Sequence, residues 1–187
     1  MNNQVNHKGT VTLKTKRLIL RKILPEDCNE VYTWMSDPEV NKYERWQLHP
    51  TPQYSRGYII EVFDGYKSNL TYQWGMELDG KLIGSVSVVG IDDFDQKADI
   101  GYALARKYWN HGYTTEAVKS VIDFMFMEVG LNRLEANHGV KNPASGKVLR
   151  KAGMRLEGHA MEFFYSNSGF QDSDLYGLTR SAYLEKK

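Results

Sequence analysis

The segment from Tyr72 to Val89 constrains the fold of this chain more than any other part of the sequence. Apolar residues recur at about every second position on both sides of Asp79-Gly80, a pair that favours the tight turn of a two-residue hairpin. We therefore predict antiparallel strands over Tyr72–Leu78 and Lys81–Val89. Another strand, Ala98–Ala105, is predicted after a polar turn, so antiparallel pairing dominates the middle of the chain.

The residues before this hairpin predict one strand and a group of helices. Thr12–Ile23 is rich in Leu, Ile and Val and indicates a single strand. A helix is predicted to begin at Pro25, because proline suits the first turn and the acids that follow lie near the positive end of the helix dipole. A short helix, an irregular loop and a longer amphipathic helix are then predicted at Asp37-Pro38, Arg45–Pro52 and Gln53–Tyr66.

The residues after the central strands add one crossover and a closing hairpin. Tyr113–Val129 is the most regular helical segment, with Ala117, Val121 and Met125 on one face and Gly130 as its C-terminal stop. The remaining predicted elements are a strand, a helix and a hairpin at Arg133–His138, Pro143–Ala152, and Met154–Tyr165 with Phe170–Tyr183. Hairpins followed by a single strand-helix-strand crossover indicate an α+β fold, because a doubly wound sheet would alternate throughout.

Composition narrows the class of protein. A chain of 187 residues suits one domain, and we expect residues 12–183 to be structured and the polar ends, Met1–Lys8 and Glu185–Lys187, to be frayed. The net charge of +1 argues against a dedicated nucleic-acid binder, and the basic run Lys14–Arg17 is interpreted as the polar face of an edge strand. One cysteine, Cys28, and no apolar run of membrane-spanning or signal-peptide type favour a cytoplasmic protein.

The turn into the long helix is the first candidate for chemistry. His111-Gly112-Tyr113-Thr114-Thr115 joins a strand to a helix start, where unpaired N–H groups and partial positive charge suit a pyrophosphate. Gly112 would let the backbone approach the phosphates. An ordinary strand-to-helix loop with the threonines as caps explains the same residues equally well. No G-x-G-x-x-G or Walker A loop is present.

Longer stretches of the sequence resemble one family. Ile100–Leu104 with Tyr108–Ala117 is similar to the acetyl-CoA-binding motif of GNAT acetyltransferases, in the branch of the Rim-type ribosomal-protein N-terminal acetyltransferases and the spermidine acetyltransferases. Leu131–Ala136 and Asn142–Met154 follow at the spacing of this branch, and Thr15–Arg21 resembles its first strand. The resemblance covers roughly Thr12 to Tyr183.

The resemblance implies a fold and a co-substrate. The fold is a mixed, mostly antiparallel sheet of about seven strands, flanked by helices, in which the fourth and fifth strands splay apart around the pantetheine arm of acetyl-CoA. Backbone groups of the fourth strand are expected to bind that arm, and those of the following loop are expected to bind the pyrophosphate. The residues concerned are Tyr102, Ala103 and Leu104 in the strand, Asn110, His111, Gly112, Tyr113, Thr114 and Thr115 in the loop, and Asn142, which is expected to contact the arm or the acceptor.

Thr114 stands where many family members have Gly or Ala, and two further departures bear on the chemistry. Leu149 stands where many members have a tyrosine that protonates the departing thiolate, so Ser145 is the candidate acid, as in the Rim-type branch; a helix-capping hydroxyl is a comparable reading. A thiol pKa near ~8.5 makes the thiolate a tolerable leaving group without strong assistance. Met161 replaces an arginine of many Rim-type relatives, which puts a specific ribosomal-protein acceptor in doubt.

A base is needed because an ammonium has no lone pair with which to attack a thioester. At pH 7, deprotonation costs about 1 kcal/mol for an α-amine and about 4 kcal/mol for a lysine-like amine. Asp99 is the first candidate base and Glu162 the second, and His138 has less support; a structural carboxylate is at least as good an interpretation of Asp99. Acceptor-pocket candidates, which can equally be core residues, are Trp34, Arg45, Trp46, Tyr72, Phe164 and Tyr165.

The resulting hypothesis is direct acetyl transfer from acetyl-CoA to a primary amine, with a protein N-terminal α-amine favoured. A polyamine or aminoglycoside acceptor and a catalytically silent CoA-binding regulatory module are the alternatives. The histidines show no zinc-ligand spacing, so no metal is expected. Relatives are often dimers, and the final hairpin offers an edge for a homodimer.

Overall fold

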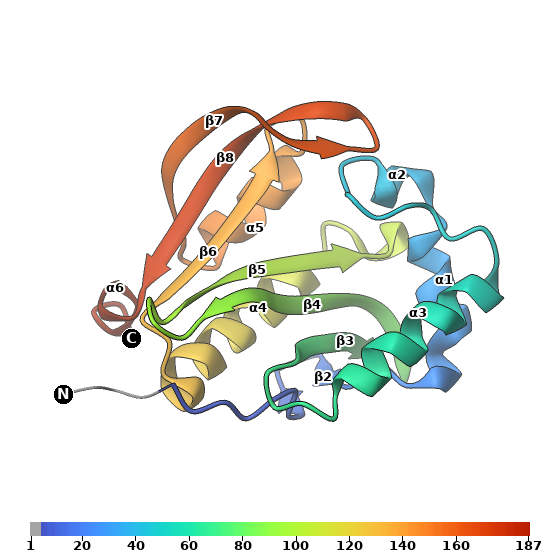
Figure 1. Ribbon diagram of the computed structural model, residues 1–187, viewed down its shortest axis with the longest axis horizontal. Helices are drawn as coiled ribbons and strands as arrows, with labels where there is room; N and C mark the ends of the chain where they lie inside the picture. The colour runs from blue at the N-terminus through green and yellow to red at the C-terminus, as the bar shows by residue number, and fades with distance from the viewer. Residues whose placement is uncertain (1–4) are drawn as a thin grey trace.

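A computed structural model describes residues 5–187, and its centre is one eight-stranded sheet in the order β1-β2-β3-β4-β5-β6-β8-β7 (Figure 1). All neighbouring strands are antiparallel except β5 and β6, which are parallel. The strands are β1 Leu13–Lys14, β2 Ile19–Arg21, β3 Tyr72–Leu78, β4 Lys81–Asp92, β5 Lys97–Leu104, β6 Arg133–Gly139, β7 Arg155–Ser166 and β8 Gly169–Thr179. The architecture is the expected α+β fold.

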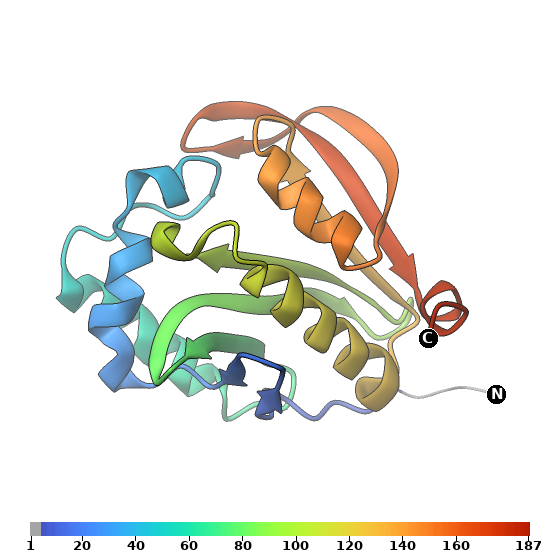
Figure 2. The same cartoon turned by 180° about the vertical axis from the view of Figure 1, so that it is seen from behind.

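Helices cover both faces of the sheet. The α-helices are α1 Cys28–Met35, α2 Pro38–Asn41, α3 Pro52–Gly65, α4 Tyr113–Phe124, α5 Pro143–Lys151 and α6 Arg180–Leu184. Short 3₁₀ turns, η1 Pro25–Asp27 and η2 Arg106–Tyr108, precede α1 and α4, and a π turn, η3 Met125–Val129, extends α4. Helices α1 and α3 lie in front of the sheet in Figure 1, and α4 and α5 lie behind it, as Figure 2 shows.

The main core lies between the sheet and α4. Ala117, Val118, Val121 and Ile122 share one face of α4 and are fully buried against sheet residues such as Trp74. Each large aliphatic side chain buried in this way contributes about 1.5–3 kcal/mol, which fixes the position of α4 along the sheet. A smaller core joins α1 and α3 to the sheet through Val31, Trp34 and Ile59. In the part of the chain that is described, no helix combines the length and apolar character of a membrane span.

The structure corrects the sequence predictions at both ends of the chain. Thr12–Ile23 is not one strand but two short ones, β1 and β2, because Thr15 N–H donates to the Leu18 carbonyl (2.9 Å) and turns the chain back. The sheet therefore has eight strands rather than about seven, and the expected fourth and fifth strands are β5 and β6. The last strand ends at Thr179, where the threonine side chain caps α6.

The expected fraying of Met1–Lys8 is wrong for Val5–Lys8; residues 1–4 lie outside the described part of the chain. Asn6 N–H donates to the Val129 carbonyl at 2.8 Å. His7 contacts the Tyr72 hydroxyl and Asp93, and Lys8 pairs with Glu128. The segment is held because these contacts attach it to η3 and to the end of β4. At the other end, Lys187 is paired with Asp123 at 2.6 Å.

The strands β5 and β6 separate soon after they meet. Their parallel register covers Lys97–Asp99 opposite Arg133–Glu135, and beyond it they diverge, as Figure 1 shows. β4 pairs with β5 as far as Leu104, so one edge of Ile100–Leu104 is hydrogen-bonded, whereas the other edge faces the gap. The expected splayed pair is therefore present in the structure.

Candidate functional site

The start of α4 is shaped like an anion receptor. Gly112 is the N-cap residue in the left-handed conformation (φ 79°), a region that glycine adopts without steric cost. Asn110, two residues earlier, is also left-handed (φ 64°). Among the described residues, no side chain caps this helix, so neither Thr114 nor Thr115 acts as the cap that sequence left open. The first-turn N–H groups are thus available to an anion.

Arg17 holds this turn in place. Its Nε donates to Glu116 at 2.7 Å, its Nη1 donates to the His111 carbonyl at 2.9 Å, and its guanidinium lies 4.4 Å from the Tyr113 ring centre. Glu116 also accepts from the Arg17 N–H and from the Thr15 hydroxyl. The turn between β1 and β2 is therefore fastened to the first turn of α4, and Arg17 brings a cation beside the uncapped N-terminus. Its interpretation as part of an edge-strand face is corrected.

The loop before α4 is also ordered by its own side chains. Trp109 Nε1 donates to the Leu104 carbonyl at 2.8 Å, and His111 Nδ1 lies 2.7 Å from the Trp109 carbonyl. The His111 and Tyr113 rings stack at 5.7 Å. The loop therefore runs from the end of β5 to Gly112 in a defined conformation.

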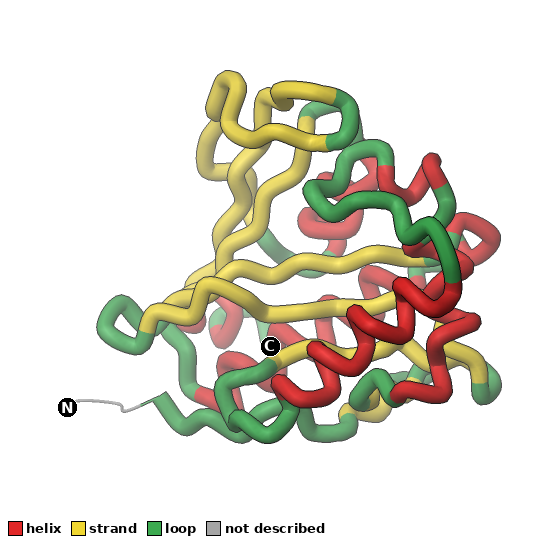
Figure 3. Tube along the Cα trace, turned by 45° about the vertical axis from the view of Figure 1, so that its right-hand side comes forward, coloured by secondary structure: helices red, strands yellow, loops and turns green. Residues whose placement is uncertain are grey.

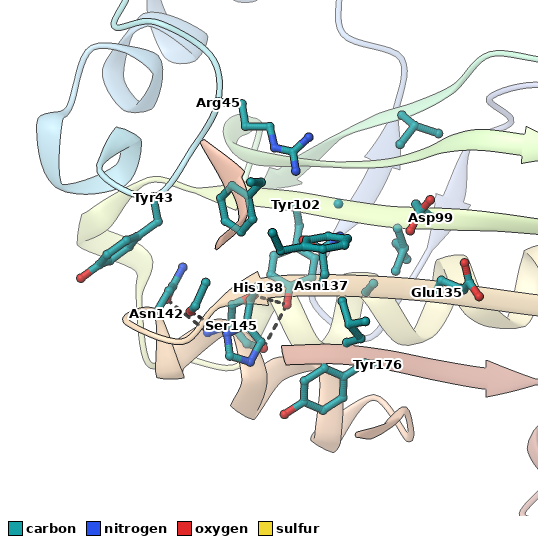
Figure 4. A pocket seen from close by; sticks show the side chains of 18 of the residues that line it. Tyr43, Arg45, Asp99, Tyr102, Glu135, Asn137, His138, Asn142, Ser145 and Tyr176 are labelled. Carbon is teal, nitrogen blue, oxygen red and sulfur yellow. Dashed lines mark hydrogen bonds between the residues drawn. The ribbon is translucent and has the colours of Figure 1, made fainter. Parts of the chain in front are cut away.

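A cavity of about 820 Å³, which we call the β5–β6 cavity, occupies the gap between the splayed strands (Figure 4). Tyr102, His138, Asn142 and Ser145 lie together at one end of it, and Asp99 and Glu135 lie at the other. Its volume is within the range typical of ligand sites.

Tyr102 and Ser145 form a hydroxyl pair across this gap. Their hydroxyl oxygens are 2.8 Å apart, and the Tyr102 hydroxyl also donates to the Ser145 carbonyl at 3.0 Å. Burial raises the pKa of Tyr102 above its ordinary value, so its phenol keeps its proton at neutral pH. The N-terminus of α5 is capped by Asn142, whose side-chain oxygen accepts from the Ser145 N–H at 3.4 Å. The Ser145 hydroxyl is thus oriented by Tyr102 and is not the helix cap.

Leu149, which replaces the family tyrosine, is fully buried in the main core. The sequence assigned only backbone contacts to Tyr102 and overlooked its hydroxyl. Its position two residues from Ile100 on the same face of β5 could have suggested a side chain that points toward α5.

The carboxylates at the other end of the cavity are mostly paired. Asp99 lies opposite Glu135 in the parallel register, and burial followed by the charge of Glu135 raises the pKa of Asp99. Arg133 pairs with Glu135 at 2.6 Å and with Glu157 on β7. Asp99 lines the cavity at the end where the two strands are still paired.

The structure does not bring the other two base candidates to the same place as Asp99. Glu162 is exposed and left-handed (φ 44°) at an irregularity in β7, outside the cavity lining, and its N–H donates to Asp172. His138 lines the cavity but is buried, with Nδ1 2.8 Å from the Gly139 carbonyl. Its ring packs against Tyr176 with the centroids 5.5 Å apart.

A second cavity, of about 580 Å³, lies on the α3 side of β5, and we call it the α3 cavity. Glu44, Trp46, Gly101 and Tyr102 line both cavities, so the two adjoin across β5. Burial raises the pKa of Glu44 to about 7, whereas a hydrogen bond from Trp46 acts in the opposite direction. Sequence reasoning missed Glu44 because no local pattern marks it.

The acceptor-pocket candidates divide between this site and the core. Arg45, Trp46 and Phe164 line the β5–β6 cavity, whereas Trp34 and Tyr72 are buried in the two hydrophobic cores. Tyr165 is 66% exposed on β7.

Comparisons with known proteins agree with this geometry. Residues 17–155 match the family model described as "Acetyltransferase (GNAT) domain", and the chain belongs to the GNAT acetyltransferase family. It is 31% identical to "Uncharacterized N-acetyltransferase p20" of Bacillus licheniformis over 92% of this chain and 98% of that protein. It is 24% identical to the spermidine N(1)-acetyltransferase of Escherichia coli K12 over 88% of this chain and 87% of that one.

Solved structures of the family share the fold. The ribosomal-protein-S5-alanine acetyltransferase of Vibrio fischeri superposes with a TM-score of 0.80, at 25% identity, over 91% of this chain and 97% of that one. The protein is therefore an acyltransferase of the GNAT type, and the regions that resemble the family in sequence correspond to the observed splayed strands and α4 turn.

Proposed function

We propose that this protein transfers an acetyl group from acetyl-CoA to a primary amine, with the α-amine at a protein or peptide N-terminus as the favoured acceptor. The observation that carries the proposal is the Tyr102–Ser145 hydroxyl pair at the gap between β5 and β6. It lies on the path from the uncapped α4 start to the cavity that an acceptor would enter.

The residues present suit acetyl-CoA. The free edge of Tyr102–Leu104 offers backbone groups to a pantetheine arm, as an added strand would use them, except for the Leu104 carbonyl, which accepts from Trp109. The amides that follow Gly112 suit a pyrophosphate, with Arg17 beside them. The amide nitrogen of Asn142 remains available to the arm, because only its oxygen caps α5. Acetyl-CoA supplies the acetyl group as a thioester.

Ser145 is the proposed acid. Its hydroxyl can pass a proton to the departing sulfur and take one from Tyr102, whose raised pKa keeps the phenol protonated. A thiol pKa near ~8.5 means that this step needs modest assistance.

The charge of the cavity favours an acceptor with one amine over a polyamine. Arg133 pairs with both Glu135 and Glu157, so Asp99 and Glu44 are left as the carboxylates that lack an ion pair among the described lining residues. Two such carboxylates give the cavity a limited negative charge for a polyamine, which carries several ammonium groups. The named relatives include enzymes of both acceptor types, a ribosomal-protein acetyltransferase and a spermidine acetyltransferase.

Acetyl transfer can be measured directly as release of free thiol. The protein is incubated with acetyl-CoA and a panel that contains unblocked peptides beginning with alanine or serine, spermidine, an aminoglycoside and free lysine. We expect the peptides to give the highest kcat/KM. Faster turnover of spermidine would replace the peptide acceptor with a polyamine, and CoA binding without turnover of any amine would favour a silent binding module.

A second experiment tests the proposed pyrophosphate turn. Gly112→Glu should abolish acetyl-CoA binding, because it introduces a carboxylate beside the phosphates and a side chain at a left-handed position. Unchanged affinity in calorimetry, with the fold intact by circular dichroism, would remove the turn from the site. A cytoplasmic location and a homodimer remain part of the proposal, and size-exclusion chromatography with light scattering tests the latter.

A further inference from the structure

Glu44 occupies a position that the reaction described so far does not use. It lines both the β5–β6 cavity and the α3 cavity, and Tyr102 borders both as well. Its charge lies close enough to Tyr102 to raise the pKa of that hydroxyl further. Glu44 is therefore near the hydroxyl pair and at the junction through which an acceptor would approach it.

The backbone around Glu44 is held by the β7–β8 hairpin, at one end of the sheet. Asn167, in the turn between β7 and β8, donates its backbone N–H to the Glu44 carbonyl at 3.1 Å. Its side-chain Nδ2 lies within 3.2 Å of the carbonyls of Asn41, Glu44 and Trp46. Figure 3 shows this turn beside the loop between α2 and α3. The backbone that carries the Glu44 side chain is therefore held by this turn.

The surroundings of Glu44 leave its carboxylate without a cation. Arg45 directs its guanidinium at the Phe164 ring, 4.8 Å from the ring centre, and no salt bridge involves Glu44 among residues 5–187. The titratable or charged groups that share its two cavities are Tyr43 and Arg45 on its own segment, His49 before α3, Tyr54, Tyr58 and Glu61 on α3, Asp99 and Tyr102 on β5, Arg133, Glu135 and His138 on β6, Glu157 on β7 and Tyr176 on β8. The pKa of this carboxylate is about 7, which suits a base that works near neutral pH.

We infer that Glu44 is the general base that deprotonates the acceptor amine, an inference that rests on the proposed acetyl transfer. The Glu44 carboxylate takes one proton from the incoming ammonium, and the freed nitrogen lone pair attacks the thioester carbonyl carbon. The N–C bond forms, the C–S bond breaks and its electron pair leaves on sulfur. The nitrogen loses its second proton, sulfur gains one through Ser145, and one proton in total passes to solvent.

Asp99 is the competing base, and the geometry separates the two. Asp99 lies where β5 and β6 are still paired, beside Glu135, and Figure 4 places both at the end of the cavity away from Ser145. The charges that act on Asp99 are those of Glu135 and Lys97. Glu44, in contrast, acts on Tyr102 itself.

The test compares Glu44→Gln with Glu39→Gln, a matched control that removes the same charge from an exposed position on α2. The assay is the pH dependence of kcat, from pH 6 to 9.5, with acetyl-CoA and an alanine-initiated peptide. We expect the wild-type kcat to rise with a midpoint near pH 7. In Glu44→Gln the midpoint should move to the pKa of the bound α-amine, about 8 or above. The loss should be about 100-fold at pH 6.5 and narrow toward pH 9.5.

Binding of acetyl-CoA, measured by calorimetry, should be within about two-fold of wild type in both variants, and Glu39→Gln should keep the wild-type profile. An unchanged midpoint in Glu44→Gln would overturn the inference while leaving acetyl transfer intact. The same conclusion would follow if Asp99→Asn shifted the midpoint and Glu44→Gln did not. A uniform loss at every pH would also overturn it, because that would indicate a role in positioning. A wild-type protein that acetylates no amine would overturn the proposed function itself.

Discussion

At the scale of single residues, the proposed mechanism uses two hydroxyl groups in place of the tyrosine that many family members have at position 149. Leu149 is buried in the core and has no proton to donate. Tyr102 approaches the same region from β5 instead, and it reaches Ser145 at 2.8 Å. Because burial holds the pKa of Tyr102 above its ordinary value, this pair remains protonated well above neutral pH.

Removal of either hydroxyl should slow the reaction without weakening co-substrate binding. We expect Tyr102→Phe and Ser145→Ala each to lower kcat about 10- to 100-fold, with the Kd for acetyl-CoA nearly unchanged. The kcat of the double variant should be only slightly lower than that of the slower single variant, because the two substitutions interrupt the same proton path. Steady-state kinetics with calorimetry measures this. Losses that multiply in the double variant would show that the two hydroxyls act independently.

The raised pKa of Glu44 also predicts that the stability of the fold depends on pH. Its pKa is about 7 in the folded chain and near ~4.3 when unfolded, so between these values the folded state binds more protons. The contribution of Glu44 to stability therefore falls as pH rises from about 4 to 7 and stays low above that. Glu44→Gln removes this cost, which after allowance for partial exposure is of order 1–2 kcal/mol.

The variant should consequently melt about 3 °C or more above wild type at pH 8, although we expect it to be a poorer enzyme. The two melting temperatures should converge at pH 4.5. Scanning calorimetry at both pH values measures the difference. A variant less stable than wild type at pH 8 would show that the carboxylate is stabilised where it lies.

At the scale of elements, the start of α4 is assembled from two parts of the chain. The uncapped turn at Gly112 is local, but its partner Arg17 comes from the turn between β1 and β2. The ion pair between Arg17 and Glu116 is partly exposed, and such pairs contribute about 0–1 kcal/mol to stability. We therefore assign its importance to the conformation of the loop rather than to the fold.

Arg17→Ala should raise the KM for acetyl-CoA about five- to ten-fold, with kcat and melting temperature close to wild type. Lys16→Ala, which removes an exposed charge from the adjacent residue, is the control and should be silent. The KM for acetyl-CoA is measured for each variant at low and at high salt, and the values of the two variants are compared. Equal effects of the two variants would mean that Arg17 contributes only general positive charge.

What the sequence could predict follows the same division between local and distant contacts. The hairpin at Asp79-Gly80, the face of α4 and the turn at Gly112 depend on periodicity and on residues a few positions apart, and the structure has all three. The break of Thr12–Ile23 into β1 and β2 depends on one local hydrogen bond that alternation does not reveal. Glu44 and Arg17 reach the site through tertiary contacts alone, so no spacing rule could identify them.

At the scale of the whole molecule, the β7–β8 end of the sheet is joined to the helical layer beside the site. The tip of the β7–β8 hairpin contacts the loop between α2 and α3 through Asn167, through the Ser168 hydroxyl, which donates to the Lys42 carbonyl at 2.7 Å, and through Phe164 under Arg45. In Figure 1 this contact bridges the upper and lower parts of the molecule beside the open end of the β5–β6 gap. The hairpin therefore holds the loop that carries Glu44.

Asn167→Ala should loosen this loop while leaving the rest of the fold intact. Loss of two or three hydrogen bonds at about 1 kcal/mol each should speed amide exchange over residues 41–49 by about 10- to 100-fold. The kcat/KM for the amine should also fall, because Glu44 is no longer held, whereas the Kd for acetyl-CoA should stay unchanged.

Asn167→Asp should be at least as harmful, since its carboxylate would face three carbonyl oxygens. Ser168→Ala, which removes one hydrogen bond, should have a smaller effect in the same residues. Hydrogen exchange is measured by mass spectrometry. If the hairpin does not hold the loop, residues 41–49 should exchange at the wild-type rate in all three variants.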